Sequence, residues 1–261
     1  MVDWYLGTMG FSYKDWEGSF YPAEIKPRRY LDYYAGIFNA VEIDSTFYGV
    51  PPISNIQRWI SQTPEGFKIC TKLPRTITHN LGLSGPQGLV DEFLGVMRSL
   101  KNRLGIILIQ FPASFKADQF LALASFLESL PSDIRFACEV RHPSWHNDRY
   151  IQLLTKLGVA YTANEYTNLP RCLYQTTDFL YVRWIGYHLR FQRHDREQID
   201  PSTQLAWWWD ALQPYLGGVN EIFGFFNNDY AGFSPGTCNR FKSLVGLTAV
   251  PLVYPKQERL F

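Results

Sequence analysis

Eight short apolar runs recur along the chain, and their number and spacing constrain the fold more than any other feature of the sequence. Each run is rich in β-branched or aromatic residues and ends near polar or turn-forming residues, which is the pattern of a buried β-strand. The runs occupy residues 3–9, 40–44, 67–72, 105–110, 135–140, 159–164, 179–184 and 221–226. The sequence therefore predicts eight short strands.

Helical patterns separate most of these runs. Apolar residues recur at spacings of three and four, opposite polar faces, within residues 30–37, 90–104, 120–130 and 150–157. Residues 204–216 are also helical in pattern but apolar nearly all round, so their three adjacent tryptophans are expected to pack against neighbouring elements. The segment 165–178 contains Pro170 and is short enough to be only a turn.

A strand followed by a helix, eight times in succession, favours parallel strands joined by right-handed crossovers. Eight such units match the size of a TIM-type (β/α)8 barrel, so we expect an α/β fold with a single barrel domain over residues 1–247. A doubly wound open sheet is the competing fold, but no GxGxxG turn follows the first run. Residues 248–261 contain two prolines and are expected to form an extended tail.

The composition argues against several classes of protein. The formal net charge is +1, so no global field favours nucleic acid or an acidic membrane surface. The four cysteines are scattered without a CxxC pair, which argues against a zinc ribbon and suits a reducing compartment. The N-terminus lacks a signal-peptide pattern and no apolar run approaches the ~20 residues of a membrane span, so we expect a cytoplasmic protein with no membrane partner.

Polar residues stand at the carboxyl ends of most predicted strands. Side chains of a barrel strand alternate between the barrel interior and the helix layer, and the active site of such barrels lies at the C-terminal rim. Following the alternation to the end of each run gives the predicted inward-facing set: Thr8, Glu42, Asp44, Lys72, Gln110, Glu139, Arg141, Arg183 and Asn227. We expect these residues to converge on one pocket. The alternative is a buried network of paired charges, but such a network needs one or two pairs rather than residues from six strands.

The residue types at these ends indicate an anionic ligand. Positive charge comes from Lys72, Arg75, Arg141 and Arg183. Arginine offers a planar fork that suits carboxylate or phosphate, and Glu42 or Glu139 beside a cation could act as general acid or base. Two carboxylates could also flank a glycosidic bond. No cofactor is predicted; a divalent cation is the minority alternative, with these candidate ligands: Glu42, Asp44, His79, Glu139, His142 and Asp229.

Aromatic residues crowd the segments that follow the first two runs, residues 10–22 and 45–52. Rings above a charged floor suit a sugar or a nucleobase as ligand. Aromatic side chains more often serve as core, however, so Trp16, Phe20 and Tyr21 are expected to cap the mouth of the barrel.

Six ordered blocks of the chain complete the pattern: "GTMGFSYKDWEGSFYP", "YYAGIFNAVEIDSTFYGVP", "TPEGFKICTKLPRTITH", "CEVRHPSW", "TTDFLYVRWIG" and "FFNNDYAGFSP". Over about residues 5–245 they resemble the YecE-like family, the domain of unknown function numbered 72. The resemblance implies a (β/α)8 barrel and supplies no established reaction. It implies a set of site residues at the matching positions: Thr8, Tyr13, Glu42, Thr46, Tyr48, Lys72, Arg75, His79, Gln110, Glu139, Arg141, His142, Arg183, Asn227, Asn228 and Asp229.

One position departs from the family pattern. Where the family usually has Leu-His-Gly after the arginine of the seventh strand, this chain has Trp184, Ile185 and Gly186. If the histidine that Ile185 replaces is catalytic in relatives, this protein is altered or inactive; if it only supports a loop, nothing is lost.

The last five residues of the chain, QERLF, resemble the peptide by which bacterial proteins bind the replication sliding clamp. Gln257, Leu260 and Phe261 are the candidate contacts, because an extended tail can place Leu and Phe in one apolar pocket. The alternative is that the terminal Leu-Phe packs back on its own domain.

The leading hypothesis is an enzyme, a hydrolase or lyase, that acts on a small phosphorylated or nucleotide-like anion at the C-terminal rim. Its expected catalytic residues are Glu42, Glu139 and His142. Its expected substrate-binding residues are Thr8, Tyr13, Asp44, Tyr48, Lys72, Arg75, His79, Gln110, Arg141, Arg183, Asn227, Asn228 and Asp229. The alternatives are a DNA-associated module recruited by the tail and, with least support, a glycoside hydrolase.

Overall fold

A computed structural model describes residues 2–80, 83, 87–166 and 169–252. Eight parallel strands form one sheet in the order β1-β8-β7-β6-β5-β4-β3-β2. The strands are β1 (Asp3–Thr8), β2 (Ala40–Ile43), β3 (Lys68–Lys72), β4 (Leu104–Gln110), β5 (Phe136–Glu139), β6 (Ala160–Tyr166), β7 (Phe179–Gly186) and β8 (Glu221–Phe226). β1 and β2, the two ends of this order, lie in contact, so the sheet closes into a TIM-type (β/α)8 barrel.

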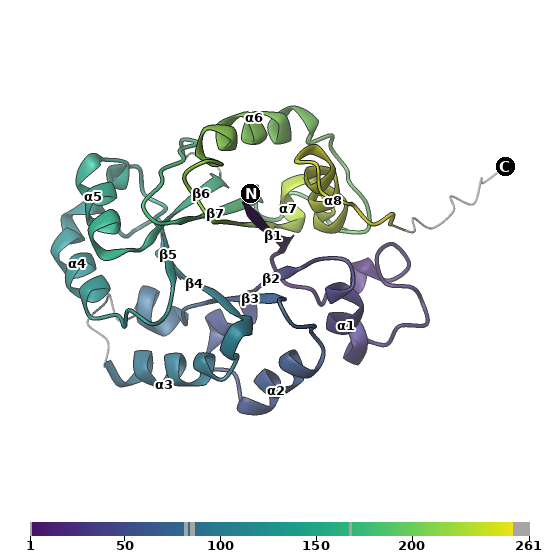
Figure 1. Ribbon diagram of the computed structural model, residues 1–261, viewed down its shortest axis with the longest axis horizontal. Helices are drawn as coiled ribbons and strands as arrows, with labels where there is room; N and C mark the ends of the chain where they lie inside the picture. Colours follow the sequence, from purple (N-terminus) through teal and green to yellow (C-terminus); the bar gives the residue numbers. More distant parts are fainter. Residues whose placement is uncertain (1, 81–82, 84–86, 167–168, 253–261) are drawn as a thin grey trace.

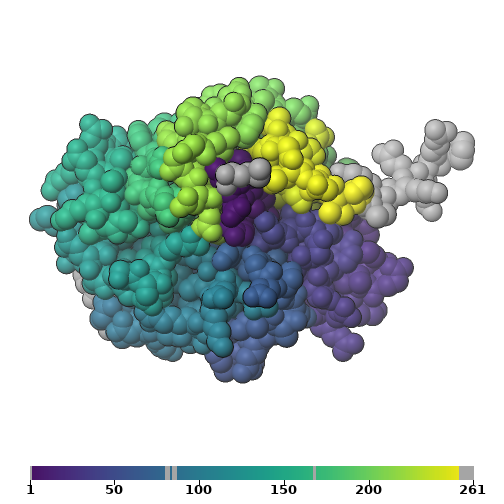
Figure 2. All heavy atoms as spheres, viewed as in Figure 1, coloured from purple at the N-terminus to yellow at the C-terminus, as the bar shows by residue number. Residues whose placement is uncertain are grey.

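Helices surround the ring of strands (Figure 1). They are α1 (Tyr30–Ala35), α2 (Ile53–Ser61), α3 (Gln87–Arg98), α4 (Phe120–Glu128), α5 (Asp148–Leu157), α6 (Ser202–Leu212), α7 (Asn228–Ala231) and α8 (Ser234–Leu244). Figure 2, seen from the same side, shows the purple residues of the N-terminal strand reaching the surface at the centre of the ring. This is the face at which the strands begin, so their carboxyl ends lie at the opposite face.

The predicted elements agree with the structure to within two residues at every strand boundary. The helical pattern of residues 204–216 corresponds to α6 and the short 3-10 turn that follows it. The expectation that its three tryptophans pack against neighbouring elements holds for Trp208, which is fully buried, but not for Trp207, which remains 40% exposed. Between β6 and β7 the described residues, 169–178, form no helix, so that crossover is the turn that the sequence allowed.

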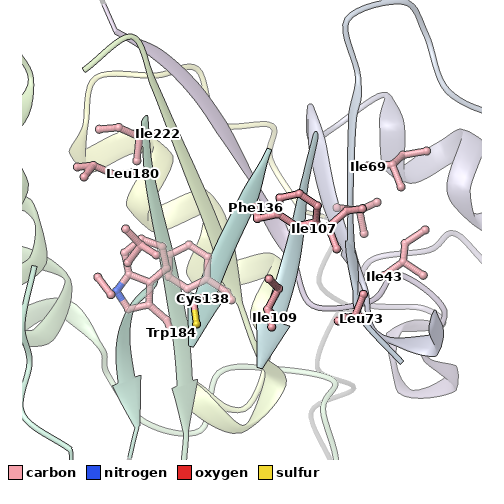
Figure 3. Close-up of a cluster of buried hydrophobic side chains, with 14 of the residues drawn as sticks. Ile43, Ile69, Leu73, Ile107, Ile109, Phe136, Cys138, Leu180, Trp184 and Ile222 are labelled. Carbon is pink, nitrogen blue, oxygen red and sulfur yellow. The ribbon is translucent and has the colours of Figure 1, made fainter. Parts of the chain in front are cut away.

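The apolar core has two layers. The larger layer lies between the strands and the helices, and Figure 3 shows part of it, with side chains such as Ile107, Cys138 and Trp184 projecting from their strands. The smaller layer fills the barrel interior with residues such as Cys70, Leu108 and Phe223. The interior is therefore a packed core up to the level at which the polar residues begin.

Side chains close the seam between β1 and β2. Among the described residues, backbone pairing across this seam is limited to the Met9–Glu42 bridge, in which Gly10 N donates to Glu42 O at 2.7 Å. Below it, Leu6 N donates to Asn39 Oδ1 at 3.0 Å, and the Asn39 amide donates to Trp4 O at 2.7 Å. An amide side chain thus replaces the missing ladder hydrogen bonds.

The Tyr34 hydroxyl, from α1, makes the second closure of the seam. It accepts from Thr8 N at 2.8 Å and donates to Ala40 O at 3.1 Å, joining β1 to β2. A Cβ at Gly7 would lie 1.9 Å from Ala40 O, so only glycine lets the two strands approach this closely.

The predicted inward orientation of Thr8 is wrong. Its hydroxyl lies within 2.9 Å of the Tyr34 hydroxyl, on the helix side, and Met9 takes the inward place at the end of β1. Both faces of this strand carry apolar residues, so the alternation of polarity could not decide which face points inward.

Two further expectations concern the C-terminal tail and membrane-spanning helices. Gln257, Leu260 and Phe261, the predicted clamp contacts, lie outside the described residues, so that prediction stays untested. Within the part of the chain that the structure describes, no helix has both the length and the apolar composition needed to cross a membrane.

Candidate active site

A network of buried charges forms the floor of the C-terminal rim. We define this charged floor as Glu42 of β2, Glu139 and Arg141 at the end of β5, and Arg183 of β7. Arg183 holds both glutamates: its Nη2 lies 2.7 Å from Glu42 Oε1 and its Nη1 lies 2.5 Å from Glu139 Oε2. Arg141 Nε donates to the other Glu139 oxygen at 2.7 Å. Alternation along each strand places these side chains inward, and barrel closure brings them together.

The two buried glutamates differ in acidity. Burial would raise the pKa of Glu139, but the Arg183 and Arg141 guanidiniums outweigh it and lower this pKa to about 2. Burial raises the pKa of Glu42 above its ordinary value against the opposing charge of Arg183. Tyr181 also donates to Glu42 Oε2 at 2.7 Å. Glu139 is therefore a fixed anion at neutral pH.

Two adjoining cavities open above the charged floor. The central cavity, of about 300 Å³, is lined by Met9, Asp44, Phe47, Tyr48, Lys72, Arg141, Tyr166, Arg183, Ile185, His188 and Asn227. The β3-side cavity, of about 410 Å³, is lined by Phe47, Lys72, Arg75, His79, Gln110, Pro112, Ala113, Arg141 and Tyr166. Phe47, Lys72, Arg141 and Tyr166 line both, so the two cavities share a wall.

Lys72 stands on this shared wall at the end of β3. Its side chain is buried, and its ammonium lies 3.8 Å from the centre of the Phe47 ring. Burial, together with Arg183, lowers the pKa of Lys72 to about 8. Thr46 fixes the backbone at this point, since its hydroxyl accepts from Lys72 N at 2.9 Å and lies 2.8 Å from Lys72 O as donor.

His79 and Gln110 lie on the β3 side. Burial and the nearby Lys72 and Arg141 charges lower the pKa of His79 to about 4, so its ring is neutral at pH 7. The amide of Gln110 donates to Phe111 O at 2.7 Å. Arg75 is exposed at the edge of the same cavity.

His188 lies on the opposite side of the central cavity and contacts the carboxylate of Asp229. His188 Nδ1 lies 3.4 Å from Asp229 Oδ2, and the same oxygen accepts from Leu189 N at 3.2 Å. Asn227 caps α7 by accepting from Asp229 N at 2.8 Å. A Cβ at Gly186 would lie 2.4 Å from Asp229 O, so glycine is needed where β7 passes α7.

The structure brings most of the predicted site residues to these cavities. Asp44, Tyr48, Lys72, Arg75, His79, Gln110, Arg141, Arg183 and Asn227 line one or both. Asp229 reaches the central cavity only through His188. Glu42 and Glu139 are fully buried and line neither, so they support Arg183 and Arg141 from beneath.

Four predicted residues have other environments. Thr8 and Tyr13 bond to the ends of their own loop, the Tyr13 hydroxyl donating to Met9 O at 2.5 Å. His142 caps a 3-10 turn, where its Nδ1 lies 2.8 Å from the Ser144 hydroxyl. Asn228 Oδ1 accepts from Trp16 Nε1 at 3.2 Å, beneath the first loop. None of the four lines the central or the β3-side cavity.

Sequence reasoning missed six residues that line the two cavities: Met9, Phe47, Pro112, Ala113, Tyr166 and His188. Tyr166 was missed because β6 continues two residues beyond the predicted end, to an inward position where Arg141 lies 4.6 Å from its ring centre. Met9 was missed through the wrong orientation of β1. Phe47 is part of an aromatic loop segment that was noted without being singled out. His188 lies in a loop, where no periodicity signals its direction.

The aromatic loops divide between core and site. Trp16, Phe20 and Tyr21 are buried, as the capping alternative expected. Ile185, where the family pattern has histidine, is 8% exposed and faces the central cavity. His188, three residues later, lines the same cavity, so an imidazole is present there from a different position.

Metal binding has no geometric support in the described part of the chain. There, no three histidine, cysteine or acidic side chains lie close enough together to hold a metal ion. The candidate ligands Glu42 and Glu139 instead share a guanidinium.

Known proteins resemble this chain in sequence. The family described as "Protein of unknown function DUF72" matches residues 5–259. The UPF0759 protein YecE of Escherichia coli (strain K12) is 41% identical over 115 residues, which are 44% of this chain and 42% of YecE. The UPF0759 protein YunF of Bacillus subtilis (strain 168) is 28% identical over 155 residues, 57% of this chain and 54% of YunF. In these matches the chain spans about half the length of each relative.

Solved structures resemble it along nearly their whole length. A DUF72 family protein from Thermotoga maritima MSB8 superimposes with a TM-score of 0.79 at 27% identity, covering 93% of this chain and 99% of that one. A DUF72 family protein from Enterococcus faecalis V583 has a TM-score of 0.77 at 19% identity, covering 95% and 99%. The second likeness, at this identity, concerns the fold alone.

Proposed function

The chain belongs to the DUF72 family of proteins of unknown function, and on that premise we propose that it is an enzyme that binds a small anionic substrate in the central and β3-side cavities. The observation that carries the proposal is that the negative side chains beneath the cavities are paired, whereas some of the positive side chains that line the cavities are not. The two buried glutamates are already paired with the arginines of the charged floor. Lys72 and Arg75 line the cavities and have no ion pair with any described residue.

The charge count around the cavities supports the same substrate class. Four cations, Lys72, Arg75, Arg141 and Arg183, line the cavities, and Asp44 is the carboxylate that lines them alongside these cations. Arg141 and Arg183 are already paired with the buried glutamates, so among the described residues Lys72 and Arg75 supply the unpaired positive charge of this concave site. A concave, low-dielectric site concentrates such a field and attracts an anion of matching size. A phosphate or carboxylate between Lys72 and Arg141 would receive charge-assisted hydrogen bonds from both.

Proton transfer in the proposed reaction belongs to Asp44 and His188. Both line the central cavity, whereas Glu42 and Glu139, the pair expected from the sequence, are buried in the charged floor and do not line the cavity. Asp44 is 38% exposed and lies 3.9 Å from Arg183, beyond hydrogen-bonding distance. Its carboxylate can therefore meet a substrate directly, and His188 can do so from the opposite side.

Glycoside hydrolysis gains no support from this geometry. A glycosidase places the sugar between its two carboxyl groups. Here the guanidinium of Arg183 occupies the space between Glu42 and Glu139 and bonds to both.

Calorimetric titration with inorganic phosphate and with pyruvate tests the proposal. We expect the wild-type protein to bind at least one of them with a dissociation constant on the order of 1 mM or lower, about 4 kcal/mol of binding free energy. Arg141→Gln should weaken that binding at least tenfold, because it removes a cation that lines both cavities. Arg98→Gln is the matched control, since Arg98 pairs with Asp133 on the surface.

Two outcomes contradict the proposal. One is that neither anion binds the wild-type protein. The other is that Arg141→Gln and Arg98→Gln bind phosphate and pyruvate with the same affinity.

A further inference from the structure

We propose that Lys72 is a nucleophilic catalyst, whose amine condenses with the carbonyl group of a small 2-oxo acid or aldehyde acid to form an imine. The inference rests on the proposed function and narrows it, because the acid group of such a substrate is the anion that the cavities bind. It assigns a covalent role to Lys72, which the sequence indicated only as a cation for anion binding.

The first support is the position of the amine. Lys72 is 7% exposed, yet its side chain lines both cavities. The described residues offer its ammonium no carboxylate within ion-pairing distance; the Phe47 ring, at 3.8 Å, is the contact below it. A lysine that served only as a counter-ion would gain from a carboxylate partner, whereas a nucleophile needs its nitrogen free.

The second support is the fixed direction of the side chain. Lys72 ends a strand, and the Thr46 hydroxyl bonds to both its backbone N and its backbone O. Thr46 itself is buried, with its hydroxyl 3.0 Å from Ile43 O. Lys72 is therefore held on a rigid element, as precise covalent catalysis requires.

The surroundings of Lys72 also favour the neutral amine. Burial and the charge of Arg183 oppose protonation and outweigh the carboxylates of Asp44 and Glu139, so the pKa of Lys72 falls to about 8. An ordinary lysine has a pKa near 10.4 and is almost wholly protonated at pH 7.5. Desolvation and a neighbouring cation are the two known means of activating a lysine nucleophile.

The proposed step balances without a redox partner. The lone pair of Lys72 Nζ attacks the carbonyl carbon, a C–N bond forms, and the carbonyl oxygen takes a proton to give a carbinolamine. Loss of that hydroxyl as water, with the proton from nitrogen, leaves the imine. Asp44 is the group placed to carry these protons, since it lines the same cavity and has no hydrogen bond to a described residue.

Reduction with sodium borohydride tests the inference, because hydride converts an imine into a stable secondary amine. The full-length protein is incubated with pyruvate or with glyoxylate, reduced and digested, and the modified peptide is located by mass spectrometry. We expect one dominant adduct, on Lys72, with a yield that rises around pH 8 rather than near pH 10.

Two variants test whether the amine of Lys72 forms the adduct. Lys72→Arg keeps the positive charge but removes the primary amine, so adduct yield should fall at least tenfold. Lys68→Arg is the matched control: Lys68 lies on the same strand and the same face, at its other end, and donates to Asn102 O at 3.0 Å. Its substitution should leave the adduct on Lys72 unchanged.

The outcomes separate this inference from the proposed function. Wild-type protein that binds pyruvate by calorimetry but yields no adduct on Lys72 overturns the imine and leaves anion binding in place. The imine on Lys72 is also overturned if the adducts are spread over surface lysines and the adduct yield of Lys72→Arg equals that of the wild type. Failure of both phosphate and pyruvate to bind removes the proposed function, and the imine with it.

Discussion

Arg183 is the residue on which the buried charges of this barrel depend, because among the described residues it alone bonds to both Glu42 and Glu139. The sequence predicted that these three side chains point inward, since alternation is a local property of each strand. It offered a buried network of paired charges only as the alternative, because that pairing requires β2, β5 and β7 to meet across a closed barrel. The structure shows this pairing for Glu42, Glu139 and Arg183.

Glu139→Gln should destabilise the protein strongly. The substitution leaves Arg183 Nη1 and Arg141 Nε without their shared carboxylate, and breaking a buried ion pair by removing one partner costs about 3–5 kcal/mol. Urea denaturation at pH 7 measures the loss. Asp133→Asn, which breaks the exposed pair with Arg98, serves as control and should have a much smaller effect. Equal losses in the two variants would show that the charged floor adds nothing beyond a surface ion pair.

The same variant should show a defined pH dependence. The pKa of Glu139 is lowered from 4.5 to about 2 in the folded state, so its contribution to stability is complete above about pH 4.5. It is lost progressively as the pH falls from 4.5 towards 2. The difference in unfolding free energy between wild type and Glu139→Gln should therefore narrow in that window, and a constant difference would contradict the assignment.

Lys72→Met should stabilise the protein while removing the proposed nucleophile. The pKa of Lys72 is lowered from 10.5 to about 8, so the protonated amine opposes folding at pH 7. Its removal should raise the free energy of unfolding by on the order of 2 kcal/mol. The wild type itself gains stability as the pH rises from 8 to 10.5, so the gap should close over that range in denaturation curves. Lys68→Met, at the other end of β3, should show no such gain.

Among the elements, α2 and α8 show two different reasons why helices go unnoticed in a sequence. α2 has Ile56 and Trp59 buried on one face, a spacing that a closer reading would have found. α8 begins with Pro235 in its first turn, where proline is tolerated, followed by Gly236 and Thr237, which have low helix propensity, and it packs against β1 and β8. In the second case the weak propensity of Gly236 and Thr237 conceals a helix that packing against the strands stabilises.

Tyr34→Phe should weaken the joint between β1 and β2. The change removes the hydroxyl that satisfies Thr8 N and Ala40 O, both in a buried setting, at a cost of about 2 kcal/mol. Thermal unfolding would report this as a lower Tm. Tyr33→Phe, one residue earlier in α1, is the control, because the hydroxyl of Tyr33 makes no hydrogen bond to a described residue. Identical Tm values for the two variants would argue that the strands do not need the Tyr34 contact.

For the whole molecule, the sequence predicted the barrel and the rim, and the structure added the cavities. The class of fold follows from counting strands and helices, which are local patterns. The shape of the site depends on loops such as those that carry Phe47 and His188, and loop direction leaves no periodic signal. The rim residues were therefore predictable as a set. The sequence did not predict which of them form the charged floor and which line the cavities.

The seam between β1 and β2 is joined differently from the other pairs of neighbouring strands. Seven pairs of neighbouring strands are joined by main-chain ladders, whereas the eighth has one main-chain bridge, at Met9 and Glu42, supplemented by the Asn39 amide and the Tyr34 hydroxyl. Glu42, which anchors Arg183, belongs to β2, directly beside that eighth joint. A change in the contacts of Tyr34 or Asn39 would therefore act directly beside the strand that holds the Glu42–Arg183 ion pair.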